Sequence, residues 1–151
     1  MPQSLSSLHV HLIFSTKNRE PFLENTEIRD EMHTFLGGIA KKLECPPIIV
    51  GGMEDHVHLL CLLGRTVSLA DCVKELKRVS SIWIKQRGPA LTPFAWQNGY
   101  GAFSVSASSV GDVREYIAKQ EEHHKRRSFQ DEYRALLRKH GLVWDERYVW
   151  E

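Results

Sequence analysis

The tripeptide His-Val-His occurs twice in this chain, and an apolar run follows each copy. Residues i and i+2 of a strand point to the same face of a sheet, so each copy would present two imidazoles side by side. Such a pair suits two ligands of one metal ion, and it also suits contact with phosphate. His9 with His11 and His56 with His58 are therefore candidates for chemistry, although a histidine on a sheet face is more often structural.

The stretch REYIAKQEEHH contains polar groups that can complete such a site. Tyr116 and Gln120 are four residues apart, so they lie on one face of a helix, one turn from each other. A tyrosine hydroxyl can act as a nucleophile, and an amide oxygen is a hard ligand for a cation. Each of these residues alone is equally consistent with a place in the core or at the surface. A zinc site built from His56, His58 and Cys61 is an alternative.

Composition bounds the class of protein. The chain has 151 residues, 42% of them apolar, so we expect one domain over 1–151. Its formal net charge of +1 gives no overall positive potential that would attract a polyanion. Its three cysteines form no Cys-x-x-Cys pair, which indicates reduced thiols rather than a disulfide framework. We see no signal peptide and no apolar run of membrane-spanning length, and we therefore expect a soluble, cytoplasmic protein.

The hydrophobic pattern predicts alternating strands and helices before a helical C-terminal part. Two stretches have helical spacing, and four have the branched, aromatic or apolar composition of strands. The order β-α-β-β-α-β predicts an α+β, ferredoxin-like or RRM-like antiparallel sheet with helices on one face plus C-terminal helices. The expected elements are a strand at HVHLIFST, a helix from about 24 to 43, a hairpin of IIVGGM and HVHLLCLL, a helix from 68 to about 87, and a strand within WQNGYGAFSVSAS.

Capping signals place the C-terminal helices. Ser109 and Asp112 match a capping box, which predicts a helix that runs to about Lys125. A second cap signal over 128–131 predicts a last amphipathic helix, and Gly141 is its expected stop.

Two basic segments accompany these helices. One is a polar face of the second predicted helix, and the other follows the tyrosine helix; each is either a solvated surface or a surface that tracks phosphates. Trp96, Tyr100 and Phe103 either stack on unpaired bases or belong to the core. The basic residues are Lys74, Lys77, Arg78 and Lys85 in the first segment, and Lys125, Arg126 and Arg127 in the second.

The ordered set DHVHLL, WQNGYGAFSVS and VREYIAKQEEHH resembles the HUH-type single-tyrosine transposases of small bacterial insertion sequences, including relatives associated with repetitive extragenic palindromes. HLIFSTKNR near the start and FQDEYRALLRKHGLVWDERYVW near the end resemble this family too, so the likeness spans nearly the whole chain. It implies that His56 and His58 bind metal, that Tyr116 is the nucleophile and that Gln120 is the third protein ligand. The first histidine pair matches no catalytic motif of the family, and we expect it to be structural or at most to contact DNA.

The resemblance also implies an activity. The expected reaction is cleavage and rejoining of single-stranded DNA through a 5′-phosphotyrosine at hairpin-flanked ends, with Mg²⁺ or Mn²⁺ as cofactor. Family members form homodimers, so we expect Tyr116 and Gln120 to complete the metal site of a partner copy; a monomer whose helix docks on its own sheet is the alternative.

Two other functions are a non-catalytic module that binds single-stranded nucleic acid, and a 2H phosphoesterase. The phosphoesterase needs Ser or Thr where His11 and His58 stand.

Overall fold

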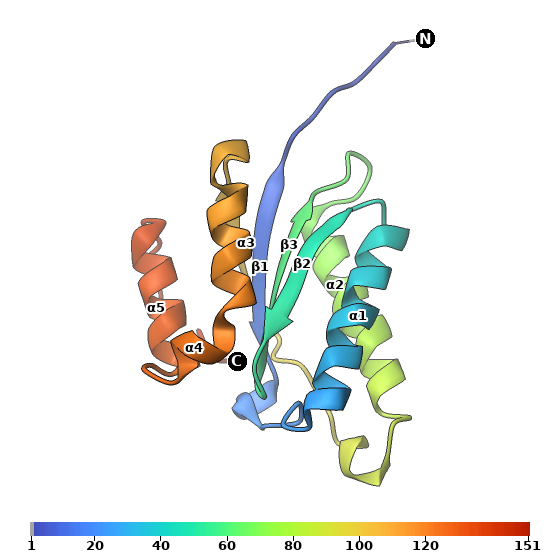
Figure 1. Ribbon diagram of the computed structural model, residues 1–151, viewed down its shortest axis with the longest axis vertical. Helices are drawn as coiled ribbons and strands as arrows, with labels where there is room; N and C mark the ends of the chain where they lie inside the picture. The colour runs from blue at the N-terminus through green and yellow to red at the C-terminus, as the bar shows by residue number, and fades with distance from the viewer. Residues whose placement is uncertain (1) are drawn as a thin grey trace.

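The computed structural model describes residues 2–151 and centres on a four-stranded antiparallel sheet (Figure 1). The strand order is β2-β3-β1-β4, so β1 and β3 lie in the middle and the two flanking strands form the edges. This order is the one expected from the β-α-β-β-α-β pattern, and the predicted ferredoxin-like sheet is confirmed. The strands are β1 His9–Ser15, β2 Pro47–Gly52, β3 His56–Leu62 and β4 Gly101–Val105.

Helices cover both faces of the sheet. α1 and α2 pack together on one face, as expected, and the C-terminal helices occupy the other (Figure 1). Three short 3₁₀ turns, η1, η2 and η3, link the elements. The helices are α1 Thr26–Lys42, α2 Leu69–Ile84, α3 Val110–Ala118, α4 Gln120–His124 and α5 Phe129–Lys139, and the turns are Lys17–Arg19, Pro89–Leu91 and Ala107–Ser109.

Two expectations for the C-terminal helices are wrong. The helix predicted to run to about Lys125 is broken at Lys119, where the chain changes direction between α3 and α4. The capping box at Ser109 does not form, because η3 precedes α3 and already gives Ser109 a helical backbone; its hydroxyl contacts Ser106 instead. The later signals are confirmed: the Ser128 side chain caps α5, and Gly141 follows that helix with φ 70°.

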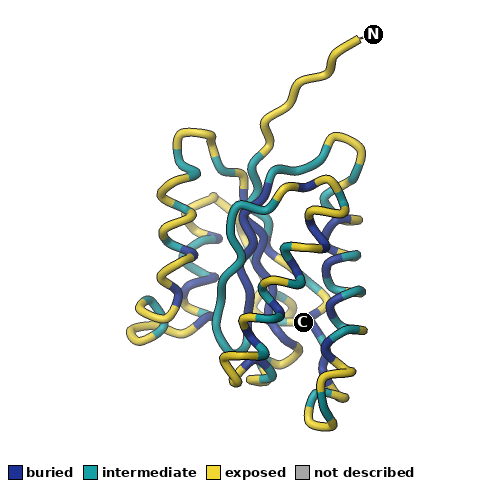
Figure 2. The backbone as a smooth tube through the Cα atoms, turned by 45° about the vertical axis from the view of Figure 1, so that its right-hand side comes forward, coloured by how far each residue is buried: buried dark blue, intermediate teal, exposed yellow. Residues whose placement is uncertain are grey.

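The alternation of side chains divides the strands between two cores. Leu12 and Phe14 of β1 face α1 and α2, where they join the larger apolar cluster. Ile13 points the opposite way, into a smaller cluster with Phe103 and residues of α5 such as Tyr133. Figure 2 shows the buried segments concentrated in the strands and on the inner sides of the helices. Every second residue of β1 and β3 therefore belongs to the layer formed by the C-terminal helices.

Two of the predicted nucleic-acid contacts have structural roles. Trp96 is buried in the larger core, and its indole N–H donates to the Ser80 hydroxyl. The Lys77 ammonium donates to three consecutive backbone carbonyls, of residues 97–99, at 2.7–3.2 Å. Lys77 therefore anchors the loop before β4, and its three N–H donors are not free for phosphate.

A glycine permits the close approach of α3 to the sheet. A Cβ atom added at Gly51 of β2 would lie 2.8 Å from both the backbone oxygen and the Cγ2 of Ile117. Ile117 is buried and directly follows Tyr116, so the position of the tyrosine depends on the absence of a side chain at Gly51.

We expect Gly51→Ala to destabilise the protein by about 1–3 kcal/mol, because α3 must move away from β2. Gly38→Ala is the matched control: Gly38 lies inside α1 with open space around it, and alanine there should stabilise by about 0.5–1 kcal/mol. Urea denaturation of both variants measures the two effects. Equal stability of the two variants would show that the contact at Gly51 does not hold α3 in place.

Candidate metal and nucleophile site

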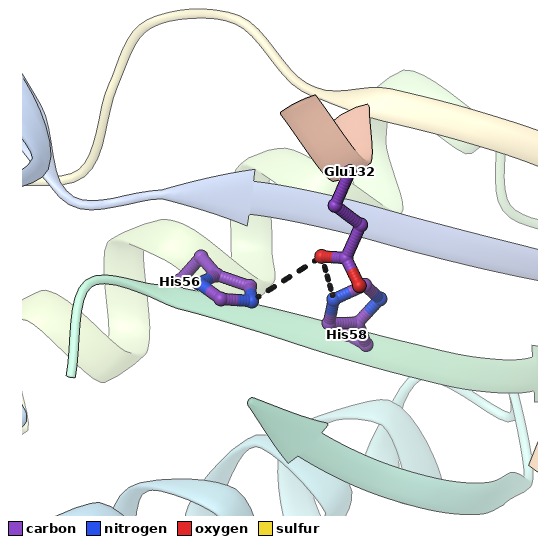
Figure 3. A group of neighbouring side chains, drawn as sticks. All are labelled: His56, His58 and Glu132. Carbon is purple, nitrogen blue, oxygen red and sulfur yellow. Dashed lines mark hydrogen bonds and ion pairs between the residues drawn. The ribbon is translucent and has the colours of Figure 1, made fainter. Parts of the chain in front are cut away.

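One buried carboxylate joins the side chains that the C-terminal helices bring to the sheet. Glu132 of α5 is fully buried, and its Oε1 lies 3.1 Å from His58 Nε2 and 3.6 Å from His56 Nε2 (Figure 3). Its Oε2 accepts hydrogen bonds from the Tyr116 hydroxyl and from Gln120 Nε2. A single side chain thus contacts both histidines of β3 on one side and the tyrosine and the amide on the other.

Gln120 and His124 close the cluster from α4. Gln120 Oε1 lies 3.1 Å from His56 Nε2 and 3.1 Å from His124 Nε2, and the same His124 nitrogen lies 3.1 Å from Glu132 Oε1. The break at Lys119 separates α4 from α3, and Gln120 is buried at the first position of α4. The four residues inferred from the sequence, His56, His58, Tyr116 and Gln120, are therefore brought together within one chain.

Each histidine of β3 has a hydrogen-bond partner at its other ring nitrogen. His56 Nδ1 lies 2.8 Å from the Asp55 carboxylate, and His58 Nδ1 lies 2.8 Å from His11 Nε2. A histidine that binds a metal through Nε2 carries its proton on Nδ1, and a hydrogen bond there fixes the ring and its tautomer. With a metal ion at Nε2, Asp55 and His11 would accept these two protons; without one, neutral His58 donates from Nε2 to Glu132 and accepts at Nδ1 from His11.

Burial sets the charges in this cluster. It lowers the pKa of His58 to about 4, despite the opposing effect of Glu132, and it lowers the pKa of His11 to about 3, with a contribution from His58. Both rings are neutral at pH 7, the state in which imidazole binds metal. Burial would also favour a protonated Glu132, but hydrogen bonds with His124 and His58 outweigh it and hold the pKa of the carboxyl group well below its usual range.

Tyr116 remains a phenol in this environment. Burial and the nearby Glu132 carboxylate both disfavour the phenolate and raise the pKa of Tyr116 above its ordinary value. The ring stacks on His123 at a centroid distance of 4.6 Å and lies 6.1 Å from the His58 ring. The tyrosine is therefore held beside the histidines as a hydrogen-bond donor to Glu132.

The donor set fits a divalent cation. The ligand atoms of His56, His58 and Glu132 all lie within 4.8 Å of one another, and all three residues are buried. Two neutral imidazole nitrogens with a carboxylate oxygen suit Mn²⁺ and Zn²⁺, and the oxygens of Glu132 and Gln120 also suit Mg²⁺. Glu132 can therefore act as a ligand beside Gln120, which the sequence alone suggested for that position.

The alternative zinc site with Cys61 is wrong. Cys61 lies three residues after His58 on the same strand, so it points to the opposite face of the sheet, and it is buried in the larger core. Burial raises the pKa of its thiol to about 12, which disfavours the thiolate that a metal requires.

The basic residues lie in two places. The first segment is on α2, on the other face of the sheet from the histidines, where Lys74, Arg78 and Lys85 line a hollow of about 460 Å³ beside Tyr100. The second segment is the turn between α4 and α5, and Arg127 there lines a cavity with Tyr116. Only this second segment adjoins the histidine cluster.

The sequence reasoning missed Glu132, His124 and the contact of His11. His124 follows Gln120 by one helical turn, a spacing visible in the sequence. The register pairs His58 with Ile13, so His11 lies diagonally opposite on the same face; the repeated His-Val-His motif on two neighbouring strands was a signal for this contact. Glu132 also had a local signal, because it lies three residues after Phe129 on the apolar stripe of the predicted last helix, where an acid is unusual. Its partners had none, since only tertiary packing brings α5 over the site.

Comparison with known proteins decides the family. Residues 4–120 match the family described as "Transposase IS200 like", which is well over half of the chain. The chain belongs to the IS200-like transposase family. Transposase function follows from this membership, and α5 with Glu132 lies beyond the matched residues.

Two solved structures resemble this IS200-like transposase. One is a protein of Deinococcus radiodurans R1 assigned as a transposase, with 26% identity and a TM-score of 0.62; the match covers 80% of this chain and 95% of that one. The other is a REP-associated tyrosine transposase bound to a REP hairpin, with 12% identity and a TM-score of 0.59, over 82% of this chain and 72% of that one. The second likeness concerns the fold alone. No curated protein matches the sequence.

In the part of the chain that the structure describes, every helix is too short or too polar to cross a membrane.

We expect His11→Ala to weaken Mn²⁺ binding by about 10–100-fold, because His58 loses the acceptor that fixes its ring. His9→Ala should leave the affinity unchanged, since no contact joins His9 to His58 in the described residues. Titration with Mn²⁺, followed by the electron paramagnetic resonance signal of the free ion, measures both affinities. Glutamine at position 11 can still accept a hydrogen bond and should restore part of the loss. Equal affinities for the His9 and His11 variants would contradict this role.

Proposed function

We propose that this chain, as one transposase domain over 1–151, cleaves and rejoins single-stranded DNA through a covalent 5′-phosphotyrosine at Tyr116. The observation that carries the proposal is the contact of Glu132 with both the Tyr116 hydroxyl and the two histidines of β3. A module that only binds nucleic acid needs no buried tyrosine beside a set of metal ligands. The same contact therefore favours an enzyme over the non-catalytic alternative.

The protein groups suggest a balanced reaction. Tyr116 Oη forms a bond to the scissile phosphorus, and the bond from phosphorus to the 3′ oxygen breaks. Glu132 Oε2 orients the Tyr116 hydroxyl through their hydrogen bond, the phenol proton is lost to solvent, and the departing 3′ oxygen takes up a proton from solvent, so the proton count is unchanged. Rejoining reverses these steps: a 3′ hydroxyl attacks the phosphotyrosine, and the phenol of Tyr116 re-forms. Since phenolate is a better leaving group than an alkoxide, the bond energy is retained and no nucleotide cofactor is needed.

A divalent cation, Mg²⁺ or Mn²⁺, would be held by His56 and His58, with Glu132 and Gln120 as oxygen donors. Such an ion polarises the scissile phosphate and offsets the charge that develops on the leaving oxygen. Asp55 and His11 would keep the two imidazoles in the correct tautomer.

The proposed DNA substrate is a hairpin with a single-stranded flank. The REP hairpin bound by the structurally similar transposase supports this choice. Arg127 lines a cavity with Tyr116, and Lys125 and Arg126 directly precede it in the turn after α4, so these three are the proposed contacts of the cleaved strand. Lys74, Arg78 and Lys85 remain candidate contacts for the duplex.

The test of the proposed function is covalent trapping. With end-labelled hairpin-flank DNA and Mn²⁺, the protein should give an adduct that survives a denaturing gel. Tyr116→Phe should give none, and His56→Ala or His58→Ala should abolish the adduct while hairpin binding is largely retained, since they remove ligands and not the DNA surface. Full cleavage by His58→Ala would end the assignment of the metal site. Stable hairpin binding without any adduct would favour the non-catalytic module.

The structure supports a site completed within one chain. Tyr116 contacts Glu132 and Gln120 contacts His56 within one chain. Gly51, which has no side chain, lets α3 pack closely on the sheet of the same chain. We therefore propose an intramolecular site as the alternative to a tyrosine helix that crosses to a partner copy, and that crossing stays an untested prediction. The homodimer that the resemblance implies remains a prediction.

Mixing experiments decide between the two arrangements. A protein with His56→Ala and His58→Ala, mixed with a Tyr116→Phe protein, should stay inactive, because neither chain holds a whole site. The control is native mass spectrometry on differently tagged copies, which establishes whether mixed dimers form. Recovery of cleavage in the mixture would show that Tyr116 acts across a dimer.

A further inference from the structure

The cavity that Arg127 lines together with Tyr116 has no residue of β3 in its lining. It has a volume of about 550 Å³ and lies between β4, α3 and α5. This volume is in the range of about 300–1,000 Å³ that is typical of small-molecule sites in proteins. The metal and nucleophile cluster described above does not use this space, although Tyr116 and His11 line both.

The residues around the cavity combine an aromatic surface with positively charged side chains. The rings of Phe103 and His140 stack at a centroid distance of 4.6 Å with 26° between their planes, and Phe103 is buried beneath the exposed His140. Arg127 and Lys139 line the same space, against one acid, Asp112. The lining is therefore suited to a ligand that carries both an aromatic ring and a negative charge.

The position of the cavity narrows the choice of ligand. If the scissile phosphate of a DNA strand lies at the Tyr116 hydroxyl, the nucleotide next to that phosphate must lie close to the same hydroxyl. Unpaired bases are commonly held by stacking on aromatic or histidine rings, with Arg or Lys on the phosphates. Partial burial and the neighbouring Lys139 lower the pKa of His140, which favours the neutral ring that stacks on a base.

We propose that this cavity is a nucleotide subsite: it holds one unpaired base of single-stranded DNA against His140, with the adjoining phosphate at Lys139 and Arg127. This inference rests on the proposed function, because it assigns a substrate group to the same site. The base would be the one next to the cleaved phosphodiester, so the subsite would fix the position of the scissile bond along the strand.

The test is a binding measurement that requires no cleavage. Single-stranded tetranucleotides dA4, dC4, dG4 and dT4 are titrated into the protein with ¹³C-labelled histidine, and the ring signals are followed by NMR. A tetramer with the same sugar-phosphate backbone and no bases is the matched ligand. The His140 signal, identified from its absence in His140→Ala, should shift with at least one base-containing tetramer. The base-free tetramer should bind at least about five-fold more weakly, as expected for the loss of stacking.

Variants separate the subsite from general charge attraction. His140→Ala and Lys139→Ala should each weaken binding of the preferred tetramer by about five-fold or more. Arg138→Ala removes a charge from the same helix at a side chain that packs over Trp144 and does not line the cavity, so it should have little effect. Thermal denaturation checks that each variant folds.

Two results would overturn the subsite: no shift of His140 with any tetramer, or an equal loss of binding in Lys139→Ala and Arg138→Ala. Covalent trapping on the same protein preparation keeps the two proposals apart. An adduct without a His140 response would end the subsite and leave the proposed reaction standing. A base-dependent His140 response without an adduct would do the opposite.

Discussion

The organisation of the C-terminal half depends on the buried carboxylate of Glu132. An ionised carboxylate without partners is very costly inside a protein, and its removal from water must be offset by hydrogen bonds and opposite charges. Glu132 finds these partners on three other elements: the histidines of β3, Tyr116 of α3, and Gln120 with His124 of α4. The same contacts that compensate the charge therefore hold three helices over one strand and place the proposed nucleophile beside the candidate metal ligands.

The sheet makes this arrangement possible by separating its two faces. α1 and α2 complete an apolar core on one side, so the fold does not depend on the polar layer opposite. The second face is free to carry histidines, and the antiparallel pairing of β1 with β3 brings the two His-Val-His motifs together. One motif provides the candidate metal ligands and the other provides His11, which holds His58. The repeat in the sequence thus corresponds to a ligand pair and its support on the neighbouring strand.

The features predicted correctly from the sequence are those that depend on the spacing of nearby residues. Strand alternation predicted the shared face of His56 and His58. Helical spacing predicted Tyr116 and Gln120 as neighbours, and both contact Glu132, but from two helices separated by the break at Lys119 and not from one continuous helix. The errors concern features that local pattern does not show. One is the break at Lys119 between α3 and α4. The others depend on contacts between distant residues: Lys77 binds the carbonyls of the loop before β4, and α5 packs over the histidines. Helical periodicity separates Glu132, on the apolar stripe of α5, from Asp131, the other acid of that helix, but the partners of Glu132 could not be predicted because they lie on other elements.

The most direct test of this account is anomalous diffraction from crystals of the protein soaked in Mn²⁺. We predict one strong peak at bonding distance, about 2.0–2.4 Å, from Nε2 of His56 and His58, with an oxygen of Glu132 in the same coordination shell. Tyr116 should remain within hydrogen-bond reach of that carboxylate. A peak bound elsewhere, or a Mn²⁺ site at the two histidines from which Glu132 has turned away, would contradict the central place given to this carboxylate.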